Sequence, residues 1–364
     1  MTRRINEDLL LVGSLPAEST EDALRLGGEL FGDKVFALPD GETGDRLLWV
    51  MFEAFNLFKD HPDVEVLREQ VPAPGMPEMF PANVWSLMEL RFRDRGKEVR
   101  YETLPRIDAA IESYAVFKRL REEGVIPAGV RFQVCLPFPL SAWGNWFPDW
   151  DKDFPIHVRA YEEAMNREIP RLLEAIPAAD LAIQWDVCIE VLDLERLYTN
   201  GSIDTAWDRF AGPCGRISRA IPEEVLLGHH LCYGTAPEWP MREAQDMGLI
   251  VRMANACVET SGRRVDWLHL AGPRSLRSKD ESFFRPLQEL RSGDARVFLG
   301  LVLPADGVDG LSRRVETASN YLEDFGVAMY CGFGRQPGQS ALETLSNHRQ
   351  VVDSFASMLS PSVD

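Results

Sequence analysis

The chain carries eight short apolar runs, each followed by a segment with helical spacing or by a loop that leads to one. These runs span Leu9–Ser14, Lys34–Leu38, Val130–Leu136, Leu181–Asp186, Val225–His230, Val265–Leu270, Arg296–Leu303 and Val327–Cys331. Strands that are apolar almost throughout are buried on both faces, as parallel strands covered by helices are. The alternation therefore predicts an α/β fold, a single (β/α)₈ TIM barrel that spans residues 1–364.

Helical spacing recurs between the predicted strands, with long connections after the second and third of them. The predicted helices span Glu21–Phe31, Leu47–Phe58, Ile107–Glu123, Ile156–Ala175, Thr205–Ile221, Met241–Ser261, Phe283–Ser292, Gly310–Phe325 and Ser340–Leu359. We expect insertions at about residues 60–105 and 137–155, and basic residues from Arg91 to Lys97 alternate as along a hairpin. Gly13 lacks the further glycines of a dinucleotide-binding turn, which argues against a doubly wound sheet.

The charge and the cysteine content restrict the partners and the compartment. The chain has 39 basic and 57 acidic side chains, a formal charge of −18 that repels nucleic acids and anionic membrane surfaces. No stretch approaches the roughly 20 apolar residues of a membrane helix. Six widely spaced cysteines are unlike a disulfide framework. We therefore expect a cytoplasmic protein that binds neither nucleic acid nor membrane.

Polar residues cluster where the predicted strands end, the place where barrels of this kind carry their chemistry. The set comprises Ser14, Asp40, Glu42, Asp186, His229, His230, Cys232, His269 and Cys331. His230 and Cys232 lie two residues apart, so both side chains point to one side of the chain, and zinc accepts this pair of ligands. With Cys331 they form a candidate three-ligand site with an open position. The alternative is a hydrogen-bonded core histidine beside two small buried thiols.

Five short motifs connect these residues to a known family. They are Val12–Pro16, Asp40–Glu42, Ile183–Asp186, His230–Tyr233 and Cys331–Gly334. In order and approximate spacing they resemble the catalytic half of cobalamin-independent methionine synthase, and the chain resembles the short, single-barrel members of that family. The same wider grouping holds uroporphyrinogen decarboxylase and epoxyalkane:coenzyme M transferase. The resemblance implies a zinc-dependent methyltransferase of methionine biosynthesis that joins a homocysteine-like thiol to a methyl group from a methylated folate.

The resemblance also implies a set of metal ligands, of which one is missing. His230, Cys232 and Cys331 match the histidine and the two cysteines of the family, whereas Ala271 stands where the family has a ligating glutamate. His269 lies two residues earlier on the same predicted strand and faces the same side as Ala271. Three alternatives follow: His269 completes the set, the zinc keeps three protein ligands, or the metal is lost.

The substrate-binding residues that the resemblance implies are all polar groups at strand ends. Glu42 and Asp186 match positions that hold the amino group of homocysteine, and Ser14 matches one that contacts its carboxylate. Two carboxylates that face an ammonium make a sensible charge pairing. The alternatives are a turn-capping role for Asp186, a solvated position for Glu42 and backbone capping by Ser14.

Two further expectations concern the proton donor and the aromatic insertion. The family carries a histidine after the seventh strand that protonates the leaving group, and none is found here. Asp306 or Asp309 would then serve as the acid, which requires burial that raises the carboxyl pKa. Trp146, with its aromatic neighbours Trp143, Phe147 and Trp150, is a candidate wall for a flat ligand, or else a hydrophobic cover over the barrel.

The leading interpretation is therefore zinc-dependent transfer of a methyl or other alkyl group to or from a small thiol, with Glu42 and Asp306 as catalytic groups. The alternatives are a diverged lyase, decarboxylase or hydrolase on the same barrel, alkyl transfer to a coenzyme M-like thiol, or a non-catalytic protein that binds homocysteine or methionine. The other four cysteines are interpreted as ordinary core residues; they are Cys135, Cys188, Cys214 and Cys257.

Overall fold

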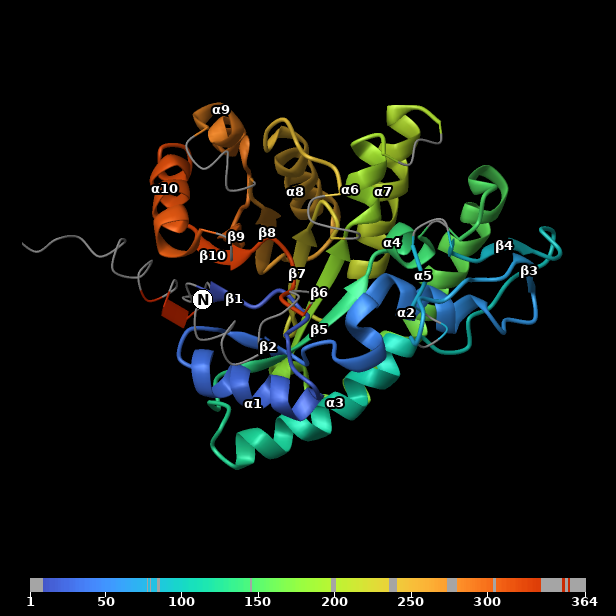
Figure 1. Ribbon diagram of the computed structural model, residues 1–364, viewed down its shortest axis with the longest axis horizontal. Helices are drawn as coiled ribbons and strands as arrows, with labels where there is room; N and C mark the ends of the chain where they lie inside the picture. The colour runs from blue at the N-terminus through green and yellow to red at the C-terminus, as the bar shows by residue number, and fades with distance from the viewer. Residues whose placement is uncertain are drawn as a thin grey trace, which may run out of the picture.

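A computed structural model describes residues 9–76, 78, 80–83, 86–144, 146–197, 201–235, 241–273, 280–303, 306–334, 349, 350 and 353. Within them, eight parallel strands curve into a nearly closed barrel surrounded by helices (Figure 1). The strands are β1 (Leu9–Leu10), β2 (Ala37–Pro39), β5 (Arg131–Pro137), β6 (Leu181–Val187), β7 (Leu226–Leu231), β8 (Trp267–Ala271), β9 (Arg296–Val302) and β10 (Gly326–Met329). Each predicted run overlaps one strand, with ends that differ by a few residues, and the predicted TIM-barrel fold is confirmed.

The barrel closes differently between its first two strands than elsewhere. The strand order is β1-β10-β9-β8-β7-β6-β5-β2, and each neighbouring pair in that order forms a parallel ladder. Between β1 and β2 the link is an isolated parallel bridge from Ser14 to Gly41, with the Leu15 N–H donating to the Gly41 carbonyl at 2.9 Å. We call this junction the seam. It holds the chain after β1 against the chain after β2, at their carboxyl ends.

The helices surround the barrel largely where the spacing predicts them. They are α1 (Thr20–Phe31), α2 (Trp49–Phe58), α3 (Pro105–Glu122), α4 (Pro139–Trp143), α5 (Trp150–Ala175), α6 (Ile189–Leu194), α7 (Ile203–Ser218), α8 (Gly248–Thr260), α9 (Glu281–Phe284) and α10 (Gly307–Ser319), with 3₁₀ turns at Gly44–Leu48, Ala178–Asp180 and Arg285–Glu289. Ser19 caps α1 by accepting from the Asp22 N–H at 3.1 Å, and Ser202 caps α7 in the same way. No helix within the described ranges is long and apolar enough to cross a bilayer.

Several predicted helices differ from the observed ones or cannot be compared with them. The helix predicted at Met241–Ser261 begins at Gly248, and the one predicted at Gly310–Phe325 ends at Ser319. The observed α5 begins at Trp150, ahead of the predicted Ile156. The prediction placed the start too late because proline is more typical of a helix start, whereas Pro155 lies inside this helix. The segment predicted as Phe283–Ser292 is a single short helix followed by a 3₁₀ turn that contains Pro286. The predicted helix Ser340–Leu359 falls almost entirely outside the described residues.

The first insertion contains an antiparallel hairpin made of β3 (Val64–Arg68) and β4 (Glu89–Phe92). Its basic residues meet local acidic partners: Arg91 pairs with Glu65 at 2.8 Å between Nε and Oε2, and Arg95 pairs with Asp153 of α5. The hairpin lies beside α4 and α5 (Figure 1), and the Leu90 N–H donates to the Trp146 carbonyl. The predicted hairpin is present, but β4 ends at Phe92, so Arg91 lies on the strand whereas Arg93, Arg95 and Lys97 follow it.

The interior of the barrel is divided into an apolar and a polar half. A small cluster near the strand starts comprises Leu10, Val12, Phe36, Ala37, Ala182, Leu226, Trp267, Phe298 and Ala328. The Phe36 ring lies 5.1 Å from that of Trp267 and 6.0 Å from that of Phe298. Farther along the strands the buried side chains include Gln184, Asp186, His230 and His269. The apolar plug therefore seals one end, and the polar groups collect toward the carboxyl ends of the strands.

A glycine on β7 makes room for the largest side chain of this plug. A Cβ atom on Gly228 would overlap the indole of Trp267, which is fully buried. We predict that Gly228→Ala lowers the free energy of unfolding by roughly 1–3 kcal/mol, because the ring has no space to move into. Urea unfolding measures the change. Gly129→Ala is the matched control, since a Cβ there meets nothing within 4 Å, and equal stabilities of the two variants would contradict the prediction.

Candidate functional site

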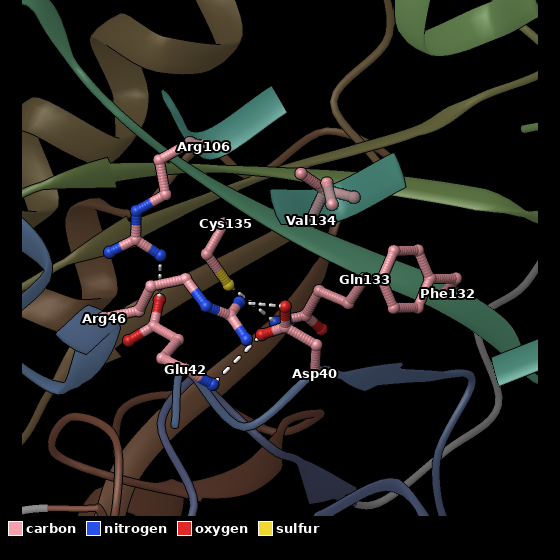
Figure 2. A pocket seen from close by; sticks show the side chains of 9 residues that line it. Asp40, Glu42, Arg46, Arg106, Phe132, Gln133, Val134 and Cys135 are labelled. Carbon is pink, nitrogen blue, oxygen red and sulfur yellow. Dashed lines mark hydrogen bonds and ion pairs between the residues drawn. The ribbon is translucent and has the colours of Figure 1, made fainter. Parts of the chain in front are cut away.

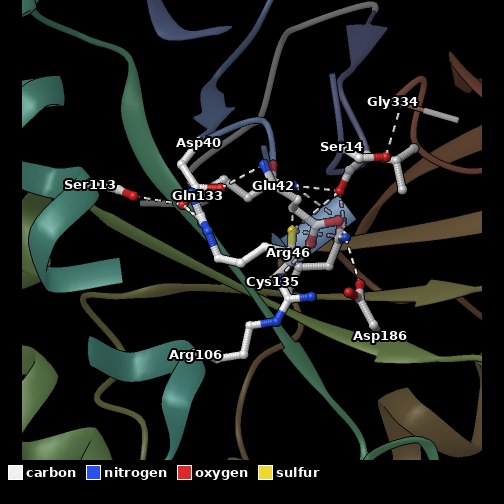
Figure 3. A network of polar contacts seen from close by, with 12 residues as sticks. Ser14, Asp40, Glu42, Arg46, Arg106, Ser113, Gln133, Cys135, Asp186 and Gly334 are labelled. Carbon is white, nitrogen blue, oxygen red and sulfur yellow. Dashed lines mark hydrogen bonds and ion pairs between the residues drawn. The ribbon is translucent and has the colours of Figure 1, made fainter. Parts of the chain in front are cut away.

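The turn after β2 places two carboxylates at the seam (Figure 3). Asp40, Gly41 and Glu42 follow the last strand residue, with Gly41 at φ 82° and Glu42 at φ 47°. A side chain on Gly41 would overlap Ala23 of α1, so the tight turn requires glycine. The Glu42 N–H donates to Asp40 Oδ1 at 3.0 Å. Both carboxyl groups are consequently buried, although they lie in a loop.

Cationic partners balance these carboxylates. Arg106, at the start of α3, donates from Nη1 to Glu42 Oε1 at 2.8 Å. Asp40 accepts from Ser113 Oγ at 2.7 Å and forms an ion pair with Arg46. Although burial acts to raise it, the Arg46 charge and the hydrogen bonds hold the pKa of Asp40 below its ordinary value. Asp40 is therefore ionised, and its hydrogen bonds fix its orientation.

A small pocket opens beside this network (Figure 2). It lies between α3 and the strands β2 and β5, and it is lined by Asp40, Glu42, Arg46, Arg106, Ala110, Phe132, Gln133, Val134 and Cys135. Charged groups of both signs reach into it next to the thiol of Cys135. A ligand that carries both positive and negative groups matches this lining.

The side chains of Glu42, Cys135 and Asp186 converge within the barrel, with their ligand-type atoms within 4.8 Å of one another. Asp186 Oδ1 accepts from Gln184 Nε2 at 2.9 Å. Burial first, and then the negative charge of Glu42, raise the pKa of Asp186 well above its ordinary value. A positive ligand group between the two carboxylates would relieve this repulsion.

A second convergence joins one imidazole and two thiols. The ligand-type atoms of His230, Cys232 and Cys331 lie within 4.8 Å of one another, and all three residues are buried. His230 belongs to β7, Cys232 directly follows that strand, and Cys331 follows β10. In register, His230 is paired with Asp186 of β6. The thiol–imidazole cluster and the carboxylates are therefore neighbours.

His269 lies beside this cluster and fixes the orientation of His230. Its Nδ1 lies 2.7 Å from His230 Nδ1, and its Nε2 lies 2.8 Å from the Met329 carbonyl. Burial lowers the pKa of His269 to about 4, so the ring is neutral at pH 7. Because a carbonyl only accepts, the Nε2 proton points to Met329 and the bare Nδ1 accepts from His230 Nδ1–H. His230 is thereby left with Nε2 as its ligand atom.

Without a bound cation, the thiols of Cys232 and Cys331 are protonated. Contact with Cys188 and burial raise the pKa of Cys232 well above its ordinary value, although Cys331 acts in the opposite direction. Contact with Cys232 and burial likewise raise the pKa of Cys331. A cation bound among them would reverse these shifts, because it favours the thiolate form.

Ser14 supports the loop that carries Cys331. The Ser14 carbonyl accepts from the Phe333 N–H at 2.7 Å, and its Oγ accepts from the Gly334 N–H at 3.2 Å. A Cβ on Gly332 would overlap the Ser14 side chain, so this close approach requires glycine. Ser14 is thus brought next to the cysteine loop, and its hydroxyl proton can donate to a ligand.

Of the two predicted acids, one is held in an ion pair and the other is exposed. Asp306 accepts from Arg314 with both oxygens, at 2.7 and 2.8 Å, so a role as acid requires that this ion pair open. Asp309 is exposed on α10. The acid role stays a prediction.

The aromatic insertion forms a packed cover. Trp146 is fully buried, and the rings of Trp143 and Phe147 stack 4.0 Å apart, with Phe147 also packed against Phe58 of α2. This packing fits the hydrophobic cover that the sequence left open as an alternative. Contact between Trp146 and a ligand stays a prediction.

The sequence analysis missed three residues of the site. Cys135 follows Gln133 at a spacing of two in a predicted strand, so the alternation could have placed it on the inner face. Cys188 contacts Cys232 from the turn after β6. Arg106 and Glu42 are 64 residues apart, and no local pattern announces their ion pair.

The fold has relatives among solved structures. No protein-family model matches the chain, and no curated protein matches it. A candidate vitamin-B12-independent methionine synthase from Listeria monocytogenes gives a TM-score of 0.55 at 14% identity, over 93% of this chain and 86% of that one. A B12-independent methionine synthase from Shewanella sp. W3-18-1, solved in complex with selenomethionine, gives 0.57 at 13% identity, over 93% and 89%. The chain shares their barrel fold.

Glu53 of α2 adds a buried acid next to the site. Burial raises its pKa from 4.5 to about 7, although the nearby Arg106 charge acts to lower it. Because the folded pKa exceeds the unfolded one, folding takes up a proton between these values. The stability contributed by this group therefore falls as the pH rises from about 4.5 to about 7, and it stays low above that range.

We predict that Glu53→Gln stabilises the protein by roughly 2–3 kcal/mol at pH 8 and changes little near pH 4.5, because glutamine keeps the shape of the neutral acid. Urea unfolding at the two pH values measures this difference. Glu163→Gln, at an exposed position of α5, is the control and should change little at either pH. Equal destabilisation by Glu53→Gln at both values would contradict the assigned shift.

Proposed function

We propose that the chain is an enzyme that transfers a methyl or other alkyl group to a small thiol amino acid, with zinc held by His230, Cys232 and Cys331. The convergence of these three ligand types beside two buried carboxylates carries the proposal. The shared barrel of the B12-independent methionine synthases supports it, and the selenomethionine bound to the Shewanella protein agrees with a substrate of this kind. Free, buried cysteines are consistent with work in the reducing cytoplasm.

The donor set suits zinc. One imidazole nitrogen and two thiolates are ligands that this ion prefers, and three protein ligands leave a position for substrate. We assign His269 as a positioning residue rather than a ligand, because hydrogen bonds engage both of its ring nitrogens. Bound zinc supplies Lewis-acid chemistry that lowers the pKa of a thiol at the open position.

The chain's own groups bind the remainder of the substrate. Asp186 lies beside His230 in register. A substrate whose amino group binds Asp186 can therefore also place its sulfur at the cluster of His230, Cys232 and Cys331. Glu42 faces the same point from the seam, and an ammonium between these carboxylates favours the ionised form of both. The Ser14 hydroxyl, next to the Cys331 loop, is assigned to the substrate carboxylate. The aromatic cover keeps water out of this compartment.

The metal assignment predicts a loss of zinc in specific variants. His230→Gln and Cys232→Ser should each lower the zinc content by about one equivalent per chain relative to wild type, because each removes a ligand from a three-ligand set. Elemental analysis of the purified, folded protein measures this content. His61→Gln is the control, since His61 is half-buried in the turn before β3, outside the barrel, and is bonded to the Arg100 carbonyl. An unchanged zinc content in both ligand variants would exclude the metal site.

One observation favours a second candidate, alkyl transfer to a coenzyme M-like thiol. The guanidinium of Arg106 is buried at the pocket and already matches the charge of Glu42. Arg46 also lines the pocket. In this candidate an anionic far end, such as a sulfonate, replaces Glu42 or Asp40 as the partner of one of these guanidiniums, because both are paired in the protein by itself.

A comparison of thiol acceptors separates the two candidates. We expect a kcat/KM for homocysteine that is roughly 10–100-fold above that for 2-mercaptoethanesulfonate, because Asp186 offers a charge-assisted hydrogen bond only to the amino acid. Initial rates with a common methyl donor measure the ratio. Asp186→Asn should reduce the preference, with Asp294→Asn, at an exposed position before β9, as the control. A preference for the sulfonate would select the second candidate.

A further inference from the structure

A third group of ligand-type side chains lies on the outer face of β7. His229 neighbours His230 in the strand, so its side chain points away from the barrel interior and toward the helices. There it meets Cys214 of α7 and Cys257 of α8, with the three ligand atoms within 4.8 Å of one another. All three residues are fully buried. This cluster therefore belongs to the layer between strand and helices and is separate from the proposed substrate site.

The spacing in this cluster is that of ligands around one ion. Tetrahedral bonds of about 2.3 Å to sulfur and about 2.0 Å to nitrogen put two ligand atoms roughly 3.5–3.8 Å apart. Cys214 Sγ lies 3.8 Å from His229 Nε2. Ser261 Oγ, at the C-cap of α8, lies 3.5 Å from the same sulfur and donates its proton to the Cys257 carbonyl, so the Cys214 thiol is the group that can donate between these two side chains.

The packing of the helices brings the thiols together. A Cβ on Gly215, the residue after Cys214, would overlap the Thr260 carbonyl at the end of α8. This glycine lets α7 and α8 approach closely exactly where their cysteines face β7. No described residue forms a hydrogen bond with His229 Nδ1, and Nε2 is the ring nitrogen that faces Cys214.

We propose that Cys214, His229 and Cys257 bind a second divalent ion of the zinc type, in a buried structural site whose three protein ligands tie α7 and α8 to β7. Binding displaces one proton from each thiol to solvent, and the ion with two thiolates and a neutral imidazole carries no net charge. Neutrality allows the site to be fully buried. The proposal does not depend on the proposed catalytic site, and β7 would then carry metal ligands on both faces.

Zinc stoichiometry in a variant of the first site tests this inference without altering the second. We expect wild-type protein from zinc-supplemented cells to hold about two equivalents and the Cys232→Ser/Cys331→Ser variant to retain about one. Cobalt substitution of that variant should give a sulfur-to-cobalt charge-transfer band. Addition of Cys214→Ser and Cys257→Ser should remove both the metal and the band, whereas Ser218→Ala, on the same face of α7, should leave them unchanged.

The outcomes separate the two metal sites. A folded Cys232→Ser/Cys331→Ser variant that holds no metal would overturn the second site and leave the catalytic proposal intact. One equivalent in wild type that persists in this variant would support the second site and count against the first. Cys214→Ser/Cys257→Ser in the otherwise natural chain provides an independent measurement, with a loss of one equivalent expected. A Cys214–Cys257 disulfide in wild type, detected as two unlabelled thiols after alkylation in denaturant, would also overturn the second site.

Discussion

The register of three neighbouring parallel strands determines the candidate site. It places Asp186, His230 and His269 in one row across β6, β7 and β8. Because neighbouring strands lie about 4.8 Å apart, the row brings a carboxylate and two imidazoles into contact, and Cys232 follows on the same face. A slip of β7 by one residue would turn His230 toward the helices and bring His229 inside. The site therefore depends on the contacts that fix this register, among them the apolar plug at the strand starts.

The seam explains how the polar half of the barrel is satisfied. Since β1 pairs with β10 through Leu9 and Leu10, the next carbonyls, of Leu11 and Val12, accept from side chains instead. Gln133 donates to both of these carbonyls, and Gln184 donates to Val12 and to the Asp186 carboxylate. The interruption of the ladder thus becomes part of the site. One amide connects the backbone at the seam to a substrate-binding candidate.

The local sequence pattern predicted the strands well, because a buried parallel strand can be identified from its own apolar run without information about the neighbouring strands. The same alternation placed His230 and Cys232 on one side. It could not identify the acceptor of His230, because the hydrogen bond to His269 depends on register between two strands. Nor could it separate ordinary thiols from grouped ones, since Cys214 and Cys257 meet only when two helices pack on β7. Contacts between residues far apart in the sequence form when the barrel closes, and a local sequence pattern does not predict them.

Charge balance offers a reason for Ala271 where the resemblance expects glutamate. Ala271 ends β8, fully buried. The compartment already holds two carboxylates, and the charge of Glu42 raises the pKa of Asp186 even with Arg106 present. Zinc with two thiolates and one neutral imidazole is uncharged, whereas a further carboxylate would leave a net negative charge near Asp186. With zinc bound as proposed, a ligand set of three, oriented by a neutral His269, would keep the interior closer to neutrality and would favour a substrate that brings the missing positive charge itself.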